Sequence, residues 1–240
     1  MVGERHCLTI RPTTDPWPLV VEIARATPPG SWALVGGMMV HVHAVRAGLT
    51  PVRPTRDVDL LLDIGVASVG TVAGALAGLG FTPADGTRGA PLHRFRRDAD
   101  VVDLLVARDV SVPTRWRRRP LLRSPGAAQA LKRLDSYILG SGDDAVAVQV
   151  PDPLGAIIAK AAAHAVDSRR PQRHLEDLVV LASAAGSPAR LDVDTLSVKD
   201  RRHLDHVLPL LLDRRHPAWA VLEPYDREIG LRVWQRLAGA

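Results

Sequence analysis

Two aspartates inside an otherwise apolar segment, Asp57 and Asp59 of DVDLLL, constrain this chain more than any other feature. In an extended strand, residues two positions apart project to the same face, so the two carboxylates should lie side by side. Neighbouring carboxylates repel each other, and a cation is the usual compensation. Upstream we expect a strand at Trp32–Val35, a turn at Gly36 and Gly37, and a helix. The stretch therefore predicts a charged site built on one strand.

The composition places this site in a globular protein. The chain has 240 residues, of which 46% are hydrophobic and 24% are charged, as is usual for a globular chain of this size. No apolar run approaches the roughly 18 residues that span a bilayer, and the N-terminus lacks the pattern of a secretory signal. Cys7 is the single cysteine, which excludes an internal disulfide framework and a cysteine-based zinc site. We expect a cytoplasmic protein with no membrane partner.

The charge is basic and comes almost wholly from arginine. The formal net charge is +5 and the sequence pI is about 10.1, a balance compatible with nucleotide or nucleic-acid partners. Residues 115–123, RWRRRPLLR, hold five arginines and a tryptophan. This segment is either a solvated basic loop or a surface that contacts phosphates.

The first 150 residues alternate between strand and helix patterns. Residues 1–16 are polar and rich in proline, so we expect a loosely packed arm. Helical spacing follows at 18–27 and 66–79. Further strands are expected at 81–85, 92–96, 100–106 and 146–150. The order predicts a mixed α+β sheet flanked by helices, in a first domain of residues 1–150.

The remaining residues, 151–240, have a helical pattern and form the predicted second domain. Asp152 and Pro153 supply a helix N-cap and a first-turn proline. Further helices are expected at residues 171–185, at 194–214 and from about 223 to 237.

A third carboxylate completes the candidate site. Asp103 lies within the apolar strand at 100–106, which we expect to neighbour the strand that carries Asp57 and Asp59. Carboxylates and substrate phosphates are the ligands that Mg²⁺ prefers, and two such ions assist phosphoryl displacement. The Gly36-Gly37 turn before a helix would let backbone N–H groups approach a phosphate. The three aspartates are therefore the predicted metal ligands and catalytic residues.

These residues, in the order strand, Gly-Gly, helix, R-x-T-x-D-V-D and a later strand with a central Asp, resemble the DNA polymerase β-like nucleotidyltransferase superfamily. Within it the chain is similar to the AbiEii-like group, which includes the MenT-type toxins of type IV toxin–antitoxin systems. The helical half strengthens the resemblance through VPDPLGAIIAK, an arginine-rich interval and RHLEDLVVL. The resemblance spans about residues 30–185.

The resemblance implies a nucleotide-binding role for six residues. Four belong to the first half and two to the helical half: Arg53 and Thr55 beside the triphosphate, Gly36 and Gly37 along the phosphates, Lys160 on the phosphates, and Asp177 positioning Lys160 or the nucleotide. It also implies that Asp103 activates the acceptor hydroxyl.

Two positions depart from the superfamily pattern. Gly37 stands where a serine is common, so that hydroxyl is missing, and His174 stands where an aspartate commonly precedes the Asp-Leu pair. Neither departure touches the three carboxylates. His41 and His43, two positions apart on a helix, do not share a face and make a poor zinc site.

The prediction is therefore a Mg²⁺-dependent nucleotidyltransferase that moves an NMP from an NTP to a hydroxyl acceptor and releases pyrophosphate. The basic charge favours tRNA as the acceptor, and the resemblance suggests a toxin with a cognate antitoxin protein. Two alternatives stay open. One is an enzyme that modifies an antibiotic or a protein, and the other is a non-catalytic nucleotide- or RNA-binding module of the same fold.

Overall fold

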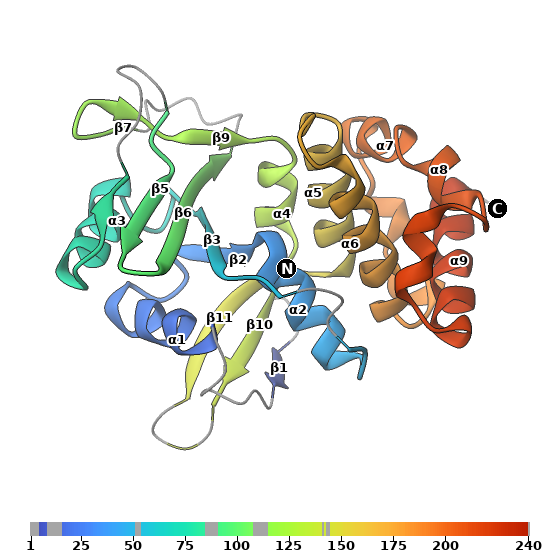
Figure 1. Cartoon of the computed structure of the whole chain (residues 1–240), viewed down its shortest axis with the longest axis horizontal. Coiled ribbons are helices and arrows are strands. Elements are labelled where there is room, and N and C mark those ends of the chain that lie inside the picture. Colours follow the sequence, from blue (N-terminus) through green and yellow to red (C-terminus); the bar gives the residue numbers. More distant parts are fainter. Residues whose placement is uncertain are drawn as a thin grey trace.

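The computed structural model describes residues 5–8, 16–50, 54–84, 91–107, 115–140, 142 and 145–239. Figure 1 shows the strands gathered in one half of the molecule and helices α5 to α9 in the other. The last strand ends at Pro151 and the first helix of the helical half begins at Pro153.

Nine strands of the described residues form one mixed sheet in the order β1-β10-β11-β2-β3-β6-β5-β4, with β9 beside β6. The central strands β2 and β3 are antiparallel, and β3 and β6 are parallel. Both β3 and β6 are apolar apart from their aspartates, as expected of strands covered on both faces. The bounds are β1 Arg5–Leu8, β2 Trp32–Val35, β3 Asp57–Leu62, β4 Thr82–Pro83, β5 Arg94–Arg97, β6 Asp100–Ala107, β9 Leu122–Ser124, β10 Leu134–Leu139 and β11 Val146–Pro151.

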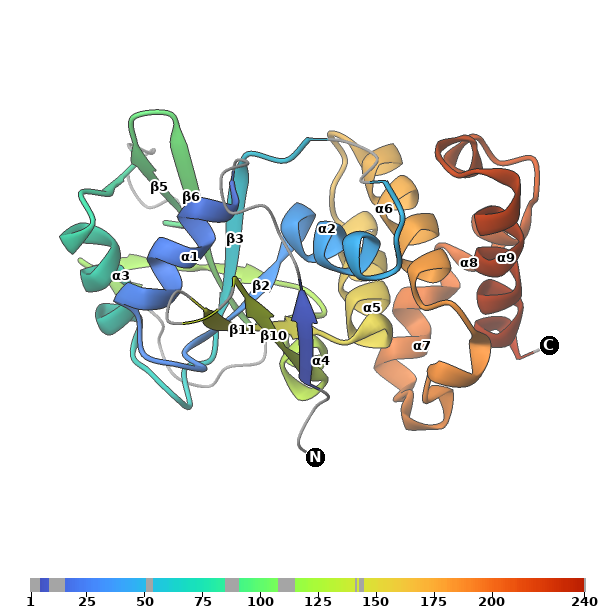
Figure 2. The ribbon, with the colours of Figure 1, turned by 90° about the horizontal axis from the view of Figure 1, so that it is seen from below.

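Helices cover both faces of this sheet. Figures 1 and 2 show α1 (Trp17–Ala26) and α3 (Val69–Gly78) on one side, and α2 (Gly36–Arg46) between the sheet and the helical half. The short helix α4 (Ala127–Lys132) packs against both β6 and the helical half. The apolar residues of the sheet and of these helices form one continuous core.

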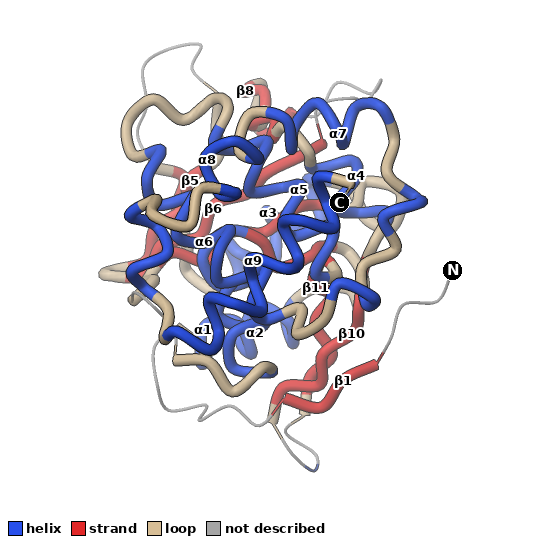
Figure 3. The backbone as a smooth tube through the Cα atoms, turned by 90° about the vertical axis from the view of Figure 1, so that its right-hand side faces the viewer, coloured by secondary structure: helices blue, strands red, loops and turns tan. Residues whose placement is uncertain are grey.

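The helical half is a stack of antiparallel helices. It comprises α5 (Pro153–His164), α6 (Pro171–Ala184), α7 (Val198–Asp205), α8 (Leu208–Leu212) and α9 (Pro224–Ala238). Figure 3 looks onto its outer side, where α9 lies in front of α6. Trp219 and Trp234 are wholly buried there. Within the described residues, no helix is long and apolar enough to cross a membrane.

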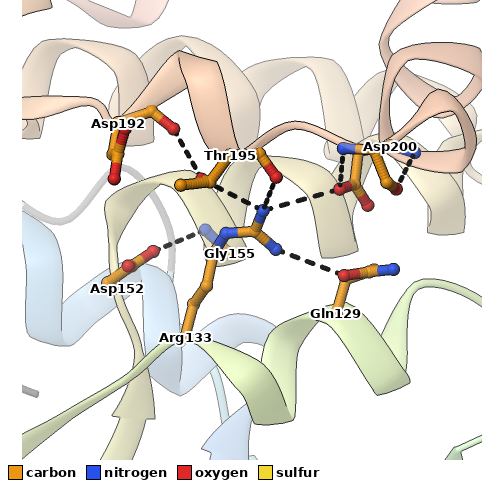
Figure 4. A network of polar contacts seen from close by, with 8 residues as sticks. Gln129, Arg133, Asp152, Gly155, Asp192, Thr195 and Asp200 are labelled. Carbon is orange, nitrogen blue, oxygen red and sulfur yellow. Dashed lines mark hydrogen bonds and ion pairs between the residues drawn. The ribbon is translucent and has the colours of Figure 1, made fainter. Parts of the chain in front are cut away.

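Arg133 ties the two halves together at the start of β10. Its guanidinium donates to the carbonyl of Thr195 at 2.9 Å and lies 3.5 Å from the carboxylate of Asp200, which is buried in α7. It also donates to Gln129 of α4 at 3.3 Å. Figure 4 shows this side chain extending from the sheet half into the helical half.

The predicted fold class, an α+β sheet flanked by helices with a helical C-terminal region, is confirmed. Three local predictions were wrong. Residues 5–8 are a strand paired with β10 and not a loose arm. Residues 115–124 form the hairpin β7 (Arg115–Trp116) and β8 (Arg119–Pro120) followed by β9, and not a loop.

The third error is the single helix predicted at 194–214, which is broken into a short 3-10 helix at Val193–Thr195, α7 and α8. Ser197 and Asp200 form a capping box that starts α7 afresh, because their side chains satisfy backbone N–H groups at a helix N-terminus. Pro209 then begins a separate helix, α8, because it supplies no N–H to a continuing helix.

Candidate active site

Strand register brings the three predicted carboxylates onto one face of the sheet. Asp59 of β3 lies directly opposite Asp103 of β6 in a parallel pair, and Asp57 lies two residues earlier on β3. Asp103 in turn lies opposite Arg94 of β5 in an antiparallel pair. Residues paired across strands project to the same side, so these four side chains share one face.

Arg94 binds two of the three carboxylates. Its Nε donates to Oδ1 of Asp103 at 2.9 Å and its Nη2 donates to Oδ2 of the same residue at 2.8 Å. The same Nη2 also donates to Oδ2 of Asp57 at 3.2 Å. The two-bond contact with Asp103 is the geometry in which arginine binds a carboxylate most strongly.

Asp59 is half-buried, and the hydrogen bonds from Arg94 go to Asp103 and Asp57 instead. The backbone N–H of Gly37 donates to its carboxylate, yet burial, then the negative charge of Asp103, raises the pKa of Asp59 to about 7. Lys160 and the Gly37 bond act in the opposite direction. The Asp59 carboxylate is therefore easily protonated unless a further cation stabilises its charged form.

The two glycines at the start of α2 allow the backbone to approach these side chains. A Cβ on Gly36 would lie 1.8 Å from Oδ2 of Asp59, and a Cβ on Gly37 would lie 2.6 Å from Oγ1 of Thr55. Gly36 also has a φ of +65°, which favours glycine. Any other residue at either position would push β3 or the segment before it away from the helix start.

Helix α5 brings Lys160 to the opposite wall. The helix begins where Asp152 accepts the N–H of Gly155 at 2.7 Å, with Pro153 in its first turn. Lys160 and Asp177 of α6 are both 5% exposed, and the lysine ammonium donates to the aspartate at 2.6 Å. The Asp177 carboxylate thus supplies the counter-charge that a buried ammonium needs.

The turn between α5 and α6 adds further polar groups. Asp167 accepts the backbone N–H of Arg169 at 2.8 Å and lies 3.0 Å from Nε2 of His174. Burial lowers the pKa of His174, so the imidazole is neutral near pH 7. Arg170 and Arg173 from the same turn reach the cavity.

These groups line one pocket of about 610 Å³ between the sheet and the helical half. The lining includes all the predicted residues that the structure describes except Asp177, which stands behind Lys160: Gly36, Gly37, Thr55, Asp57, Asp59, Asp103 and Lys160. Arg53 lies outside the described residues. The sheet side thus carries three carboxylates with Arg94 bound to two of them, and the helical side carries Lys160, Arg170 and Arg173 with Asp167 among them.

A divalent cation suits the charge of this pocket. Of the three carboxylates, Arg94 binds Asp57 and Asp103 but not the half-buried Asp59. As the side chains stand, no group of three or more His, Cys, Asp or Glu residues in the described part of the chain is arranged to hold a metal. The physical reason at this site is that the Arg94 guanidinium lies against Asp103 and Asp57. Asp57 and Asp59 are the donors that a metal could reach by displacing the single Arg94 contact.

Three arginines that line the pocket, Arg94, Arg170 and Arg173, were not predicted from the sequence, although one signal could have identified the first. Residues 98 and 99 form a two-residue hairpin loop between β5 and β6. Such a loop fixes the register, and counting outward from Arg97 and Asp100 places Arg94 opposite Asp103. Arg170 and Arg173 carried no comparable signal, because only the packing of α6 turns them toward the sheet.

Comparison with known proteins adds little to this geometry. No protein-family model matches the chain, and no curated protein sequence matches it. One solved structure, of an antigenic nucleotidyltransferase-like protein from Paracoccidioides brasiliensis, is similar with a TM-score of 0.45 and 16% sequence identity. The match covers 74% of this chain and 79% of that one. The likeness is loose, so the assignment of a function has to come from the site itself.

Proposed function

We propose that this protein is a nucleotidyltransferase that uses an NTP and a divalent cation to transfer an NMP to a hydroxyl acceptor. The observation that supports the proposal most strongly is the two-sided pocket of about 610 Å³. Asp57, Asp59 and Asp103 line one side of it, and Lys160 lines the other. A triphosphate with its cation has charge of both signs. Such a ligand fits a pocket with one acidic and one basic wall.

On the basic side, Lys160 and the arginines of the α5–α6 turn would bind the phosphate oxygens. Lys160 is held by Asp177, so it presents a fixed charge with little loss of side-chain entropy on binding. The backbone at Gly36 and Gly37 lies at the N-terminus of α2, where the helix dipole favours an anion.

On the acidic side, Asp57 and Asp59 would hold Mg²⁺, as one ion or as two. When bound, Mg²⁺ neutralises the triphosphate and the charge that develops on the departing pyrophosphate. Asp103, which Arg94 holds by two hydrogen bonds, would orient the acceptor hydroxyl and accept its proton. The phosphorus–oxygen bond to pyrophosphate breaks as the bond to the acceptor oxygen forms.

We propose tRNA as the acceptor, with a role as a type IV toxin controlled by an antitoxin protein. The sequence pI of about 10.1 and the exposed arginines of the β7–β8 hairpin support a nucleic-acid partner. The support for the toxin role is the resemblance to the AbiEii/MenT-like group.

The direct test incubates the protein with Mg²⁺, each labelled NTP and total tRNA, and measures label in the RNA. Asp57→Asn and Asp59→Asn should each reduce labelling by at least about 10³-fold, because the triphosphate loses its metal ligands. Asp205→Asn, a change of exposed charge on α7, is the matched control and should retain full activity.

Other outcomes would assign the pocket differently. Label in a protein or in a small aminohydroxylated compound, with none in tRNA, would keep the reaction and replace the acceptor. Tight NTP binding without transfer to tRNA, cellular protein or small molecules would show a binding module.

A further inference from the structure

The position of Arg94 has a consequence for how the pocket receives its cation. Its contacts with the two carboxylates are unequal. Asp103 is bound twice, at 2.9 and 2.8 Å, and its side chain is 10% exposed. Asp57 is bound once, at 3.2 Å, and its side chain is 45% exposed.

This difference decides which of the two Arg94 contacts breaks first. A bidentate contact in a buried position is strong because both bonds are charge-assisted and little water competes. A single, longer contact to a half-exposed carboxylate is weak, because water replaces it readily. The Arg94 guanidinium can therefore release Asp57 while it keeps Asp103, with no movement of β5 against β6.

We propose that Arg94 is an internal counter-ion of the carboxylate cluster, which binds Asp57 until a divalent cation takes that carboxylate and then holds Asp103 alone. The proposal rests on the proposed function as far as the cation is concerned. Arg94 is a positioning residue in this scheme. It keeps the cluster folded without metal, weakens metal binding in the absence of nucleotide, and holds Asp103 ready for the acceptor.

The arrangement makes metal binding dependent on the nucleotide. The cation must displace Arg94 from Asp57 and must also bind beside a positive charge, both of which reduce its affinity. A triphosphate supplies further oxygen ligands and negative charge, which offset that cost. The cation and the NTP therefore bind tightly only together.

Removing the Arg94 charge should change metal affinity in the opposite direction from folding stability. We expect Arg94→Gln to bind Mn²⁺ about tenfold more tightly than the wild type when no nucleotide is present, because a competing cation has been removed. The same variant without metal should unfold at a lower temperature, because Asp57 and Asp103 lose the guanidinium that binds them. If the substitution only disrupted the structure, it would lower both the Mn²⁺ affinity and the unfolding temperature.

The experiment measures Mn²⁺ binding to the nucleotide-free, full-length protein from the decrease of the free-ion electron paramagnetic resonance signal, with thermal unfolding in parallel. Arg97→Gln is the matched control. Arg97 lies on the same strand and is paired with Glu22 at 2.7 Å and Asp100 at 2.9 Å, outside the pocket. The Arg97→Gln variant should be less stable than the wild type, with no change in Mn²⁺ affinity. Arg94→Lys keeps a positive charge but loses the paired N–H donors of the guanidinium. Its Mn²⁺ affinity should fall between those of Arg94→Gln and the wild type.

A second measurement does not depend on the variants folding. A crystal structure of the wild type with Mn²⁺ and a non-hydrolysable NTP should show Asp57 released from Arg94 and Asp103 still bound to it. If Arg94 keeps both carboxylates, or if Arg94→Gln binds Mn²⁺ no more tightly than the wild type, the proposal is wrong. If the wild type binds no Mn²⁺ even with NTP present, the proposed metal-dependent function is wrong.

Discussion

At the scale of single residues, Gly36 sets the distance between α2 and the carboxylates. Gly36→Ala should lower the free energy of unfolding by about 2 kcal/mol or more, because a Cβ collides with Asp59 in a left-handed backbone conformation. Urea titration measures the change.

The matched control for this change is Gly74→Ala in α3. Gly74 has open space around its Cβ position, and alanine in a helix interior is more stable than glycine by about 1 kcal/mol. This variant should therefore be stabilised. Equal effects of the two substitutions would contradict the close packing described at Gly36.

Lys160 and Asp177 provide a second residue-scale prediction. Lys160→Met should destabilise the protein by about 3 kcal/mol, because it removes the ammonium that pairs with the buried Asp177 carboxylate. The double variant Lys160→Met with Asp177→Leu should recover part of that loss, since no buried charge remains. A double-mutant cycle in urea measures the coupling.

The exposed pair Arg214 and Glu228 is the control for this cycle. Both side chains are about half exposed, at 60% and 49%, and exposed pairs contribute about 0.5 kcal/mol. Coupling of similar size in the two pairs would show that Lys160 is not held as the structure indicates. The Lys160 variant should in addition lose NTP affinity, which the surface variant should keep.

At the scale of secondary-structure elements, His43 joins α2 to β11. Its Nε2 donates to the carbonyl of Pro151 at 2.8 Å, and burial lowers the pKa of His43 to about 4. The unfolded side chain has the ordinary value of 6.5. The stabilisation from the neutral histidine is therefore complete above pH 6.5 and is lost as the pH falls toward 4.

This shift predicts an acid-sensitive joint between the helix and the sheet. Between pH 7 and pH 4, His43 should contribute a loss of about 3 kcal/mol to the free energy of unfolding. Chemical denaturation across this range measures it, with His43→Gln as the comparison. The wild type and His43→Gln should differ in the slope of the free energy of unfolding against pH, and that difference is the contribution of His43. Parallel pH profiles would contradict the assignment.

At the scale of the whole molecule, the pocket exists only because two halves meet. The acidic wall belongs to the sheet and Lys160 belongs to α5. Arg133 is the polar contact that connects them, through Gln129, Thr195 and Asp200 (Figure 4).

Arg133→Met should therefore affect both stability and binding. It leaves Asp200, which is wholly buried, without its positive partner, at a cost of about 2 kcal/mol or more. We expect a broader unfolding transition in calorimetry and weaker NTP binding, as the helical half separates more readily from the sheet. Arg201→Gln, an exposed change on α7, should leave both unaffected. Loss of stability with unchanged NTP affinity would show that Arg133 acts on folding alone.

The fold was predictable where local patterns carry strong periodicity. Helices α1, α5, α6 and α9 lie within a few residues of their predicted bounds, because capping residues, first-turn prolines and apolar spacing are local properties. Strand β1 and the broken α7 and α8 were missed. The four-residue strand β1 forms because it pairs with β10. The predicted helix is interrupted because a capping box begins α7 inside a helical pattern.

By itself the sequence determined which chemical groups the site contains: two aspartates on one face of β3, a third on β6, two glycines before a helix and a lysine in an apolar helix. Strand alternation and helix periodicity fix those properties residue by residue. Only the tertiary structure decided that β3, β5 and β6 pair in a register that places Arg94 against Asp103 and Asp57. Likewise, only the packing of α5 and α6 placed Lys160 across the pocket. The physical reason is that register and helix packing depend on contacts between segments far apart in the chain, which no local pattern encodes.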